Sequence, residues 1–109
     1  MDYSVTDTRD YEERRKPVAQ ALGAGAIKAN QFDSLPNHEG HAHNELGTGQ
    51  EELFVALRGA GHMVLDGETV ALEPGRYVLV GPAAQRQVIA GPDGLAYLVV
   101  GAVVEGAGT

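Results

Sequence analysis

The chain has 109 residues, the length of a single domain, and its mix of 43% hydrophobic and 21% charged residues is typical of a globular protein. Its formal net charge of −7 argues against nucleic acid and anionic membranes as partners, because both would repel it. The absence of cysteine excludes disulfides and thiol catalysis and agrees with the cytoplasmic location that we expect.

Residues 1–23 are predicted to form an N-terminal arm that is partly helical. The acidic side chains of residues 10–16 precede the basic ones, an order that suits the dipole of a short helix. One more apolar turn follows at residues 18–22, and Gly23 ends it. The sequence leaves open whether this arm packs on its own domain, swaps into a neighbour or stays loose.

Residues 24–109 alternate short apolar segments with turn signals, which predicts a β-barrel or sandwich. Asp66-Gly67 is a hairpin signal. Pro74-Gly75 stands where a type II turn requires Pro and Gly. The predicted strands are residues 26–32, 51–58, 62–65, 68–72, 77–80, 85–90 and 95–103.

The strand predicted at residues 51–58 is apolar on both faces. Successive side chains of a strand point to opposite faces, so the two sets are Glu52, Phe54 and Ala56 on one face and Leu53, Val55 and Leu57 on the other. A strand that is apolar on both faces is covered on both. We therefore expect a homodimer, with a cover made by the chain's own arm as the alternative.

The segment before this strand is rich in histidine and glutamate. His41 and His43 are two residues apart, so an extended backbone turns both side chains to one face. Glu52 follows at the start of the next strand. Two imidazoles and a carboxylate in one interior would be a suitable ligand set for a divalent transition metal, namely Fe, Mn, Ni or Zn.

These residues resemble the motifs of the small single-domain cupins. The first motif is matched by His41-Ala-His43, Glu52 and Gly59, and the second in part by the Pro74-Gly75 turn with its strand and the loop at Gly81-Pro82. The resemblance covers roughly residues 35–103. It implies an all-β fold, a single jelly-roll barrel with a site in its mouth.

Two departures from the cupin pattern affect the predicted site. The gap between His43 and Glu52 is longer than usual, so residues 46–49 are interpreted as a flexible loop. This leaves Glu45, Glu51 and Glu52 as candidate ligands, with the register favouring Glu52. The last histidine of the pattern is absent, and its place falls on Arg86, which cannot be an ordinary ligand because it stays protonated, or on Gln87.

Two hypotheses follow from these residues. In the first, a metal held by His41, His43 and Glu52 serves a protein that binds or transforms a small polar or anionic molecule. The cupin resemblance admits dioxygenase, isomerase and decarboxylase chemistry as well as plain binding, so catalysis is left open. In the second, the module is metal-free and Arg86 pairs with Glu52. The expected ligand-binding residues are Arg86, Gln87, Phe54, Met63 and Tyr77.

Overall fold

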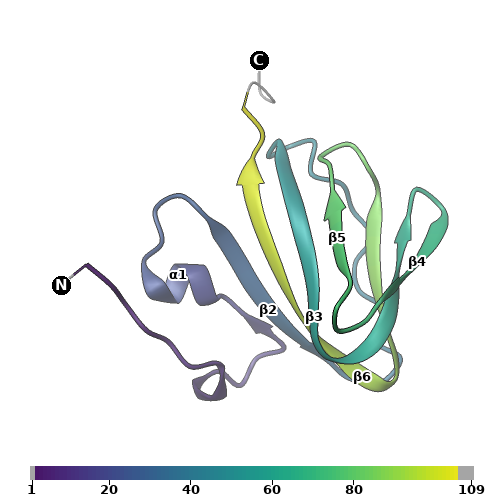
Figure 1. The fold of residues 1–109 in the computed structure, drawn as a ribbon, viewed down its shortest axis with the longest axis horizontal. Coiled ribbons are helices and arrows are strands. Elements are labelled where there is room, and N and C mark those ends of the chain that lie inside the picture. Colours follow the sequence, from purple (N-terminus) through teal and green to yellow (C-terminus); the bar gives the residue numbers. More distant parts are fainter. Residues whose placement is uncertain (1, 106–109) are drawn as a thin grey trace.

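Strands dominate the fold, as the sequence predicted. The computed structural model describes residues 2–105 (Figure 1). The strands are β1 (Arg15–Lys16), β2 (Lys28–Ser34), β3 (Gln50–Leu65), β4 (Glu68–Leu72), β5 (Tyr77–Val80) and β6 (Arg86–Val103), with a 3₁₀-helix η1 (Thr8–Asp10) and a helix α1 (Val18–Leu22). The strands pair in the order β1-β2-β6-β3-β4, and β5 pairs with β3. The predicted all-β jelly-roll class is confirmed.

The two longest strands differ from the sequence prediction, which placed turns at residues 59–61 and 91–94. Both segments lie inside continuous strands, because β3 and β6 pair on either side of register shifts near Gly59 and Gly61. A β-carbon on Gly61 would lie 2.3 Å from the carbonyl oxygen of Ile89. Glycine therefore permits the close approach that lets the paired strands bend through a bulge instead of ending.

The two predicted tight turns are present. Asp66 and Gly67 both have positive φ, 49° and 87°, as a two-residue hairpin turn of type I′ requires. At the second turn Gly75 has φ 95°, and the Arg76 N–H donates to the Glu73 carbonyl at 3.0 Å. These turns connect β3 to β4 and β4 to β5, and so return the chain to the barrel.

The core fills the inner face of the barrel, and the outer face is partly bare. On β3, Phe54 and Ala56 are buried, whereas Leu57 on the other face is 46% exposed. On β5, Tyr77 and Leu79 are exposed. The predicted cover on both faces is thus incomplete within one chain.

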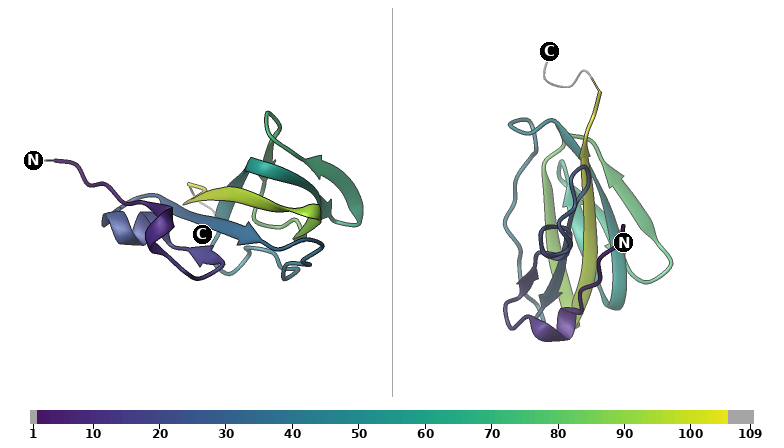
Figure 2. Two further views of the ribbon diagram at one scale, coloured as in Figure 1. Left: turned by 90° about the horizontal axis from the view of Figure 1, so that it is seen from below. Right: turned by 90° about the vertical axis from the view of Figure 1, so that its left-hand side faces the viewer.

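The N-terminal arm lies on the β2 side of the molecule, at the opposite end from β4 (Figures 1 and 2). Its β1 pairs with β2, Lys16 opposite Gln31. The Lys16 ammonium is buried and donates to the carbonyls of Tyr11 and Glu13 at 2.8 and 2.9 Å. Apart from Asp10, which ends η1, residues 10–16 are therefore not helical, because the strand pairing of Arg15–Lys16 and the Lys16 ammonium take up backbone groups that a helix would use.

The short helix α1 was predicted correctly, and Gly23 ends it with φ 74°. Among the residues that the structure describes, no helix is long and apolar enough to cross a membrane.

Candidate functional site

Backbone pairing aims His43 and Arg86 into the barrel together. The His43 N–H donates to the Arg86 carbonyl at 3.0 Å, and the Arg86 N–H donates to the His43 carbonyl at 2.8 Å. Residues that exchange both bonds stand directly opposite and point to the same face. The histidine segment thus runs along the first half of β6 as an added edge.

Glu52 reaches the same interior from β3. It shares a face with the buried Phe54, and it is paired with Val80 of β5 and Gly101 of β6. A β-carbon on Gly101 would lie 3.6 Å from the Glu52 Cγ, an ordinary contact distance, so Glu52 packs directly over this glycine. Only 14% of the Glu52 side chain is exposed.

Glu45 is carried to the site by the residues that lengthen the motif. The Gly49 N–H donates to the Glu45 carbonyl at 2.8 Å, and the Glu45 N–H donates to the Pro82 carbonyl at 2.9 Å. The Asn44 side chain also accepts from the Leu46 N–H at 3.0 Å. The expected flexible loop is a hydrogen-bonded turn, and it places the Glu45 carboxylate 3.7 Å from the His43 Nε2.

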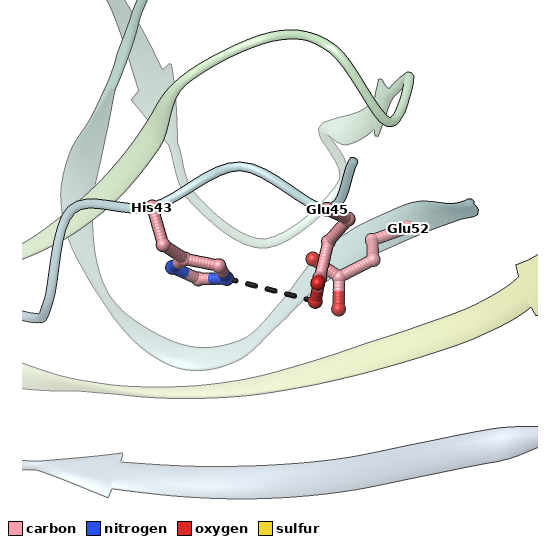
Figure 3. Close-up of side chains that lie close together, drawn as sticks. All are labelled: His43, Glu45 and Glu52. Atoms are coloured by element: carbon pink, nitrogen blue, oxygen red, sulfur yellow. Dashed lines mark ion pairs between the residues drawn. The ribbon is translucent and has the colours of Figure 1, made fainter. Parts of the chain in front are cut away.

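The side chains of His43, Glu45 and Glu52 point toward one another (Figure 3). One ligand atom from each lies within 4.8 Å of the others. His41 lies beside this group without joining it, its exposed ring 6.0 Å from the His43 ring between centroids. Of the three glutamates left open by the sequence, Glu51 is exposed, so the carboxylates of the cluster come from the other two.

The His43 ring is oriented by its own backbone. Its Nδ1 lies 3.2 Å from the His41 carbonyl oxygen. A carbonyl only accepts, so this contact needs the proton on Nδ1, and the neutral form of the ring then has its lone pair on Nε2. The Nε2 atom faces Glu45. In metal sites a hydrogen bond from one ring nitrogen to a carbonyl commonly orients the imidazole so that the other nitrogen can bind the metal.

Arg86 is the most deeply buried charged group in the described part of the chain, with 1% of its surface exposed. Its Nη2 donates to the Gly81 and Val80 carbonyls at 2.6 and 3.3 Å, and its Nε lies 3.9 Å from the Glu52 Oε1. That separation is an ion pair but too long for a hydrogen bond. The Glu52 Oε1 and the Arg86 Nε and Nη1 are buried without a hydrogen-bond partner in the described structure.

The charges at this site disfavour two free carboxylates. Burial raises the pKa of Glu52, and the neighbouring Glu45 raises it further, while Arg86 and His43 act in the opposite direction. Glu52 is therefore harder to ionise than an ordinary glutamate. A cation between the two carboxylates would relieve this repulsion and give the unpartnered oxygen a partner.

A cavity of about 250 Å³ opens beside the cluster. Of the residues predicted to bind ligand, Arg86, Gln87 and Phe54 line it, and Gln87 donates from its amide to the Gly40 carbonyl at 3.0 Å. Met63 and Tyr77 do not line it. Met63 is completely buried in the core, and Tyr77 is 68% exposed on the outer face, because it pairs with Val55 and not with an inward residue.

The cavity also has walls that the sequence did not indicate as such. Phe32 of β2 stacks on Tyr97 of β6, with 5.2 Å between ring centroids, and Arg14 of the arm lies over the Phe32 ring at 5.1 Å. All three line the cavity. Alternation along the predicted strand would have found Phe32, but Arg14 carries no local signal, because its place depends on how the arm pairs with β2.

Comparisons with known proteins identify the fold. No model of a protein family matches the chain, and no curated protein matches it in sequence. A cupin protein (BF4112) from Bacteroides fragilis is 21% identical, with a TM-score of 0.80 over 97% of this chain and 88% of that one. KdgF from Halomonas sp. is 16% identical, with a TM-score of 0.72 over 96% of both chains. The chain is a small cupin-fold domain.

A larger enzyme contains a similar domain. The salicylate 1,2-dioxygenase of Pseudaminobacter salicylatoxidans is 21% identical, with a TM-score of 0.64 over 71% of this chain and 21% of that one. At such identities the likeness establishes the fold, and the resemblance noted in the motifs is confirmed at that level. The chemistry has to be argued from the residues of the cavity itself.

Proposed function

We propose that this cupin-fold protein binds a divalent transition metal and, next to it, a small polar or anionic molecule. The observation that carries the proposal is the convergence of His43, Glu45 and Glu52, whose ligand atoms lie within 4.8 Å of one another. One imidazole and two carboxylates fit Fe, Mn, Ni or Zn. Two ionised carboxylates would outweigh the single positive charge of Arg86, so the group would attract a divalent cation. His41, which the sequence also predicted to be a ligand, lies next to His43, where it would supply a further ligand to the metal.

The size and lining of the cavity support a small ligand. Its volume of about 250 Å³ is below the ~300–1,000 Å³ of pockets that hold drug-sized molecules. A bound metal with open positions would polarise a ligand oxygen, and Gln87 would orient the ligand from the same wall. Gentisate is bound by a variant of the similar dioxygenase, which supports a small oxygenated ligand here. Any catalysis would be of the dioxygenase, isomerase or decarboxylase kind.

A second candidate function is a metal-free binding module. It is favoured by the position of the buried Arg86 Nε, 3.9 Å from the Glu52 Oε1. In this reading the guanidinium takes the place of the cation, and the cavity binds its ligand without turnover.

Elemental analysis of protein purified without an affinity tag separates the two candidates. The metal reading expects close to one transition metal per chain, with most of it lost in His43→Ala, Glu45→Gln and Glu52→Gln. Two matched controls are Glu51→Gln, whose carboxylate is exposed beside Glu52, and His62→Ala, whose imidazole lies outside the cluster. Both should keep the metal. If wild-type protein stays metal-free after incubation with Fe, Mn, Ni and Zn in turn, the metal proposal is contradicted and the metal-free binding module remains.

We also propose that the protein is a homodimer joined through its outer face, defined here as Leu53, Val55, Leu57, Tyr77 and Leu79. The register places these side chains together, with Leu53 opposite Leu79 and Val55 opposite Tyr77. Two copies of a chain of net charge −7 repel each other least where they meet through an uncharged surface, and the five side chains provide one. A second copy is therefore the occupant that this face suits.

A further inference from the structure

The structure fixes the backbone of Arg14 next to the cavity. The Asp33 N–H of β2 donates to the Arg14 carbonyl at 2.9 Å, and the following residue, Arg15, pairs with Phe32. The preceding turn is held by the buried Lys16 ammonium, which lies 3.8 Å from the Asp33 carboxylate. Contacts of the main chain and of a neighbouring side chain thus position Arg14, and its own side chain is not needed for them.

The Arg14 side chain covers the aromatic wall of the cavity. Its guanidinium lies 5.1 Å from the centroid of the Phe32 ring, within the range of a cation–π contact. Phe32 in turn stacks on Tyr97. The contact orients the guanidinium but leaves its N–H groups available, since a cation over a ring face uses its charge and not its hydrogens.

The charge of Arg14 is not balanced within the described structure. Among residues 2–105, ion pairs to carboxylates are found for Arg9, Arg58 and Arg86, whereas Arg14, Arg15 and Arg76 have none, and Arg14 is the one of these three that lines the cavity. A guanidinium presents its N–H groups in a planar fork that matches a carboxylate with two parallel hydrogen bonds. A cavity wall with a free fork of this kind selects ligands that carry such a group.

We propose that Arg14 binds the carboxylate group of the cavity's ligand, so that the N-terminal arm is part of the binding site. The inference rests on the proposed function, in which the cavity takes a small anionic molecule. A monocarboxylate suits the site better than a phosphate dianion, because Glu45 and Glu52 line the same cavity and repel added negative charge. The aromatic wall of Phe32 and Tyr97 adds a flat apolar surface beside the carboxylate.

The test compares charged ligands with uncharged ones of the same shape. Acetate, pyruvate, benzoate and salicylate are each titrated against their amides, with and without equimolar Zn²⁺, on the full chain, and binding is followed by calorimetry and by NMR shifts of the Tyr97 and Phe32 signals. The variants are Arg14→Gln and the matched Arg15→Gln, whose side chain lies on a different surface hollow, with Gln20 and Lys28. Circular dichroism checks that both variants fold.

We expect wild-type protein to prefer at least one carboxylate over its amide, and Arg14→Gln to weaken binding of that carboxylate about tenfold or more, as the loss of a charge-assisted hydrogen bond implies. Amide binding should change little, and Arg15→Gln should behave as wild type. If Arg14→Gln keeps the preference, or Arg15→Gln loses it equally, the inference about Arg14 fails while the cavity's anion binding stands. If wild-type protein prefers no carboxylate, the anionic ligand of the proposed function fails and the inference with it.

Discussion

The sheet formed by β3, β5 and β6 buries charged side chains on its inner face and exposes apolar side chains on its outer face. The inner face holds the charged Glu52 and Arg86, of which only 14% and 1% of the side chains are exposed. The outer face leaves Leu57, Tyr77 and Leu79 exposed by 46%, 68% and 63%. A monomer built only for stability would do the reverse, because buried charges are costly to desolvate and clustered exposed apolar side chains promote association.

The two proposals, a ligand on the inner face and a second copy on the outer face, would account for this contrast. A buried ion pair adds little stability compared with apolar residues of the same volume, so the inner charges are better explained by a cation or an anionic ligand. Apolar side chains gathered on one exposed face are better explained by a partner. Each of the two proposals can be tested separately, since a substitution on one face leaves the contacts of the other face intact.

The largest expected effect is on the inner face, from Arg86→Met. This change leaves the mostly buried Glu52 without its counter-ion and removes the hydrogen bonds to the Gly81 and Val80 carbonyls. We expect the free energy of unfolding of the metal-free protein to fall by about 3 kcal/mol, as found when one partner of a buried pair is removed. Urea unfolding followed by circular dichroism measures it.

The matched control is Arg76→Met in an exposed turn, which should change stability by less than about 0.5 kcal/mol. A double variant, Arg86→Met with Glu52→Leu, should recover much of the loss, because both charges are then gone. Equal stability of Arg86→Met and wild type would show that the guanidinium is not balancing Glu52.

Much of the fold was readable from the sequence because its signals are local. The Asp66-Gly67 hairpin and the Pro74-Gly75 turn depend on backbone preferences of the residues themselves. The glycines at residues 59–61 and 91–94 led to a wrong prediction, that strands end there, because this signal is local too. Glycine favours both a turn and a bulge, and the choice between them depends on a partner strand far away in sequence, as with Gly61 against Ile89.

The candidate site was readable only in part. Spacing and register led to His43, Glu52 and Arg86, because a motif position fixes which way a strand residue points. Glu45 was left as one of three candidates, since nothing local shows that residues 44–49 fold back on Pro82. Arg14 was missed, because its place depends on the pairing of β1 with β2 and on the buried Lys16. Groups delivered by loops and arms need tertiary structure to be found.

On the outer face, Leu79→Glu should separate the proposed dimer. A carboxylate placed opposite its own copy in an apolar interface has no partner, at a cost on the order of 2 kcal/mol, so association should weaken roughly tenfold or more. Light scattering should change from twice the chain mass of 11.4 kDa to once that mass. The control is Leu35→Glu, at a leucine 75% exposed outside this face, which should stay dimeric. A wild-type mass of one chain at every concentration would contradict the dimer.

The smallest expected effect is on the titration of Tyr97, at the aromatic wall of the inner face. Burial raises the pKa of its phenol above 10.0, and the positive charge of the Arg14 guanidinium opposes this rise. The unfolded chain therefore ionises Tyr97 first, and the stability that the neutral phenol contributes is lost as the pH rises from the ordinary pKa through the folded one. Tyr97→Phe should remove this loss and the late phase of phenolate absorbance.

Arg14→Gln should move that phase to higher pH, because the opposing charge is gone, whereas Arg15→Gln should leave it in place. An unmoved phase in Arg14→Gln would mean that the arm does not hold its guanidinium over this wall in solution, and the inner face would then bind its ligand without help from the arm.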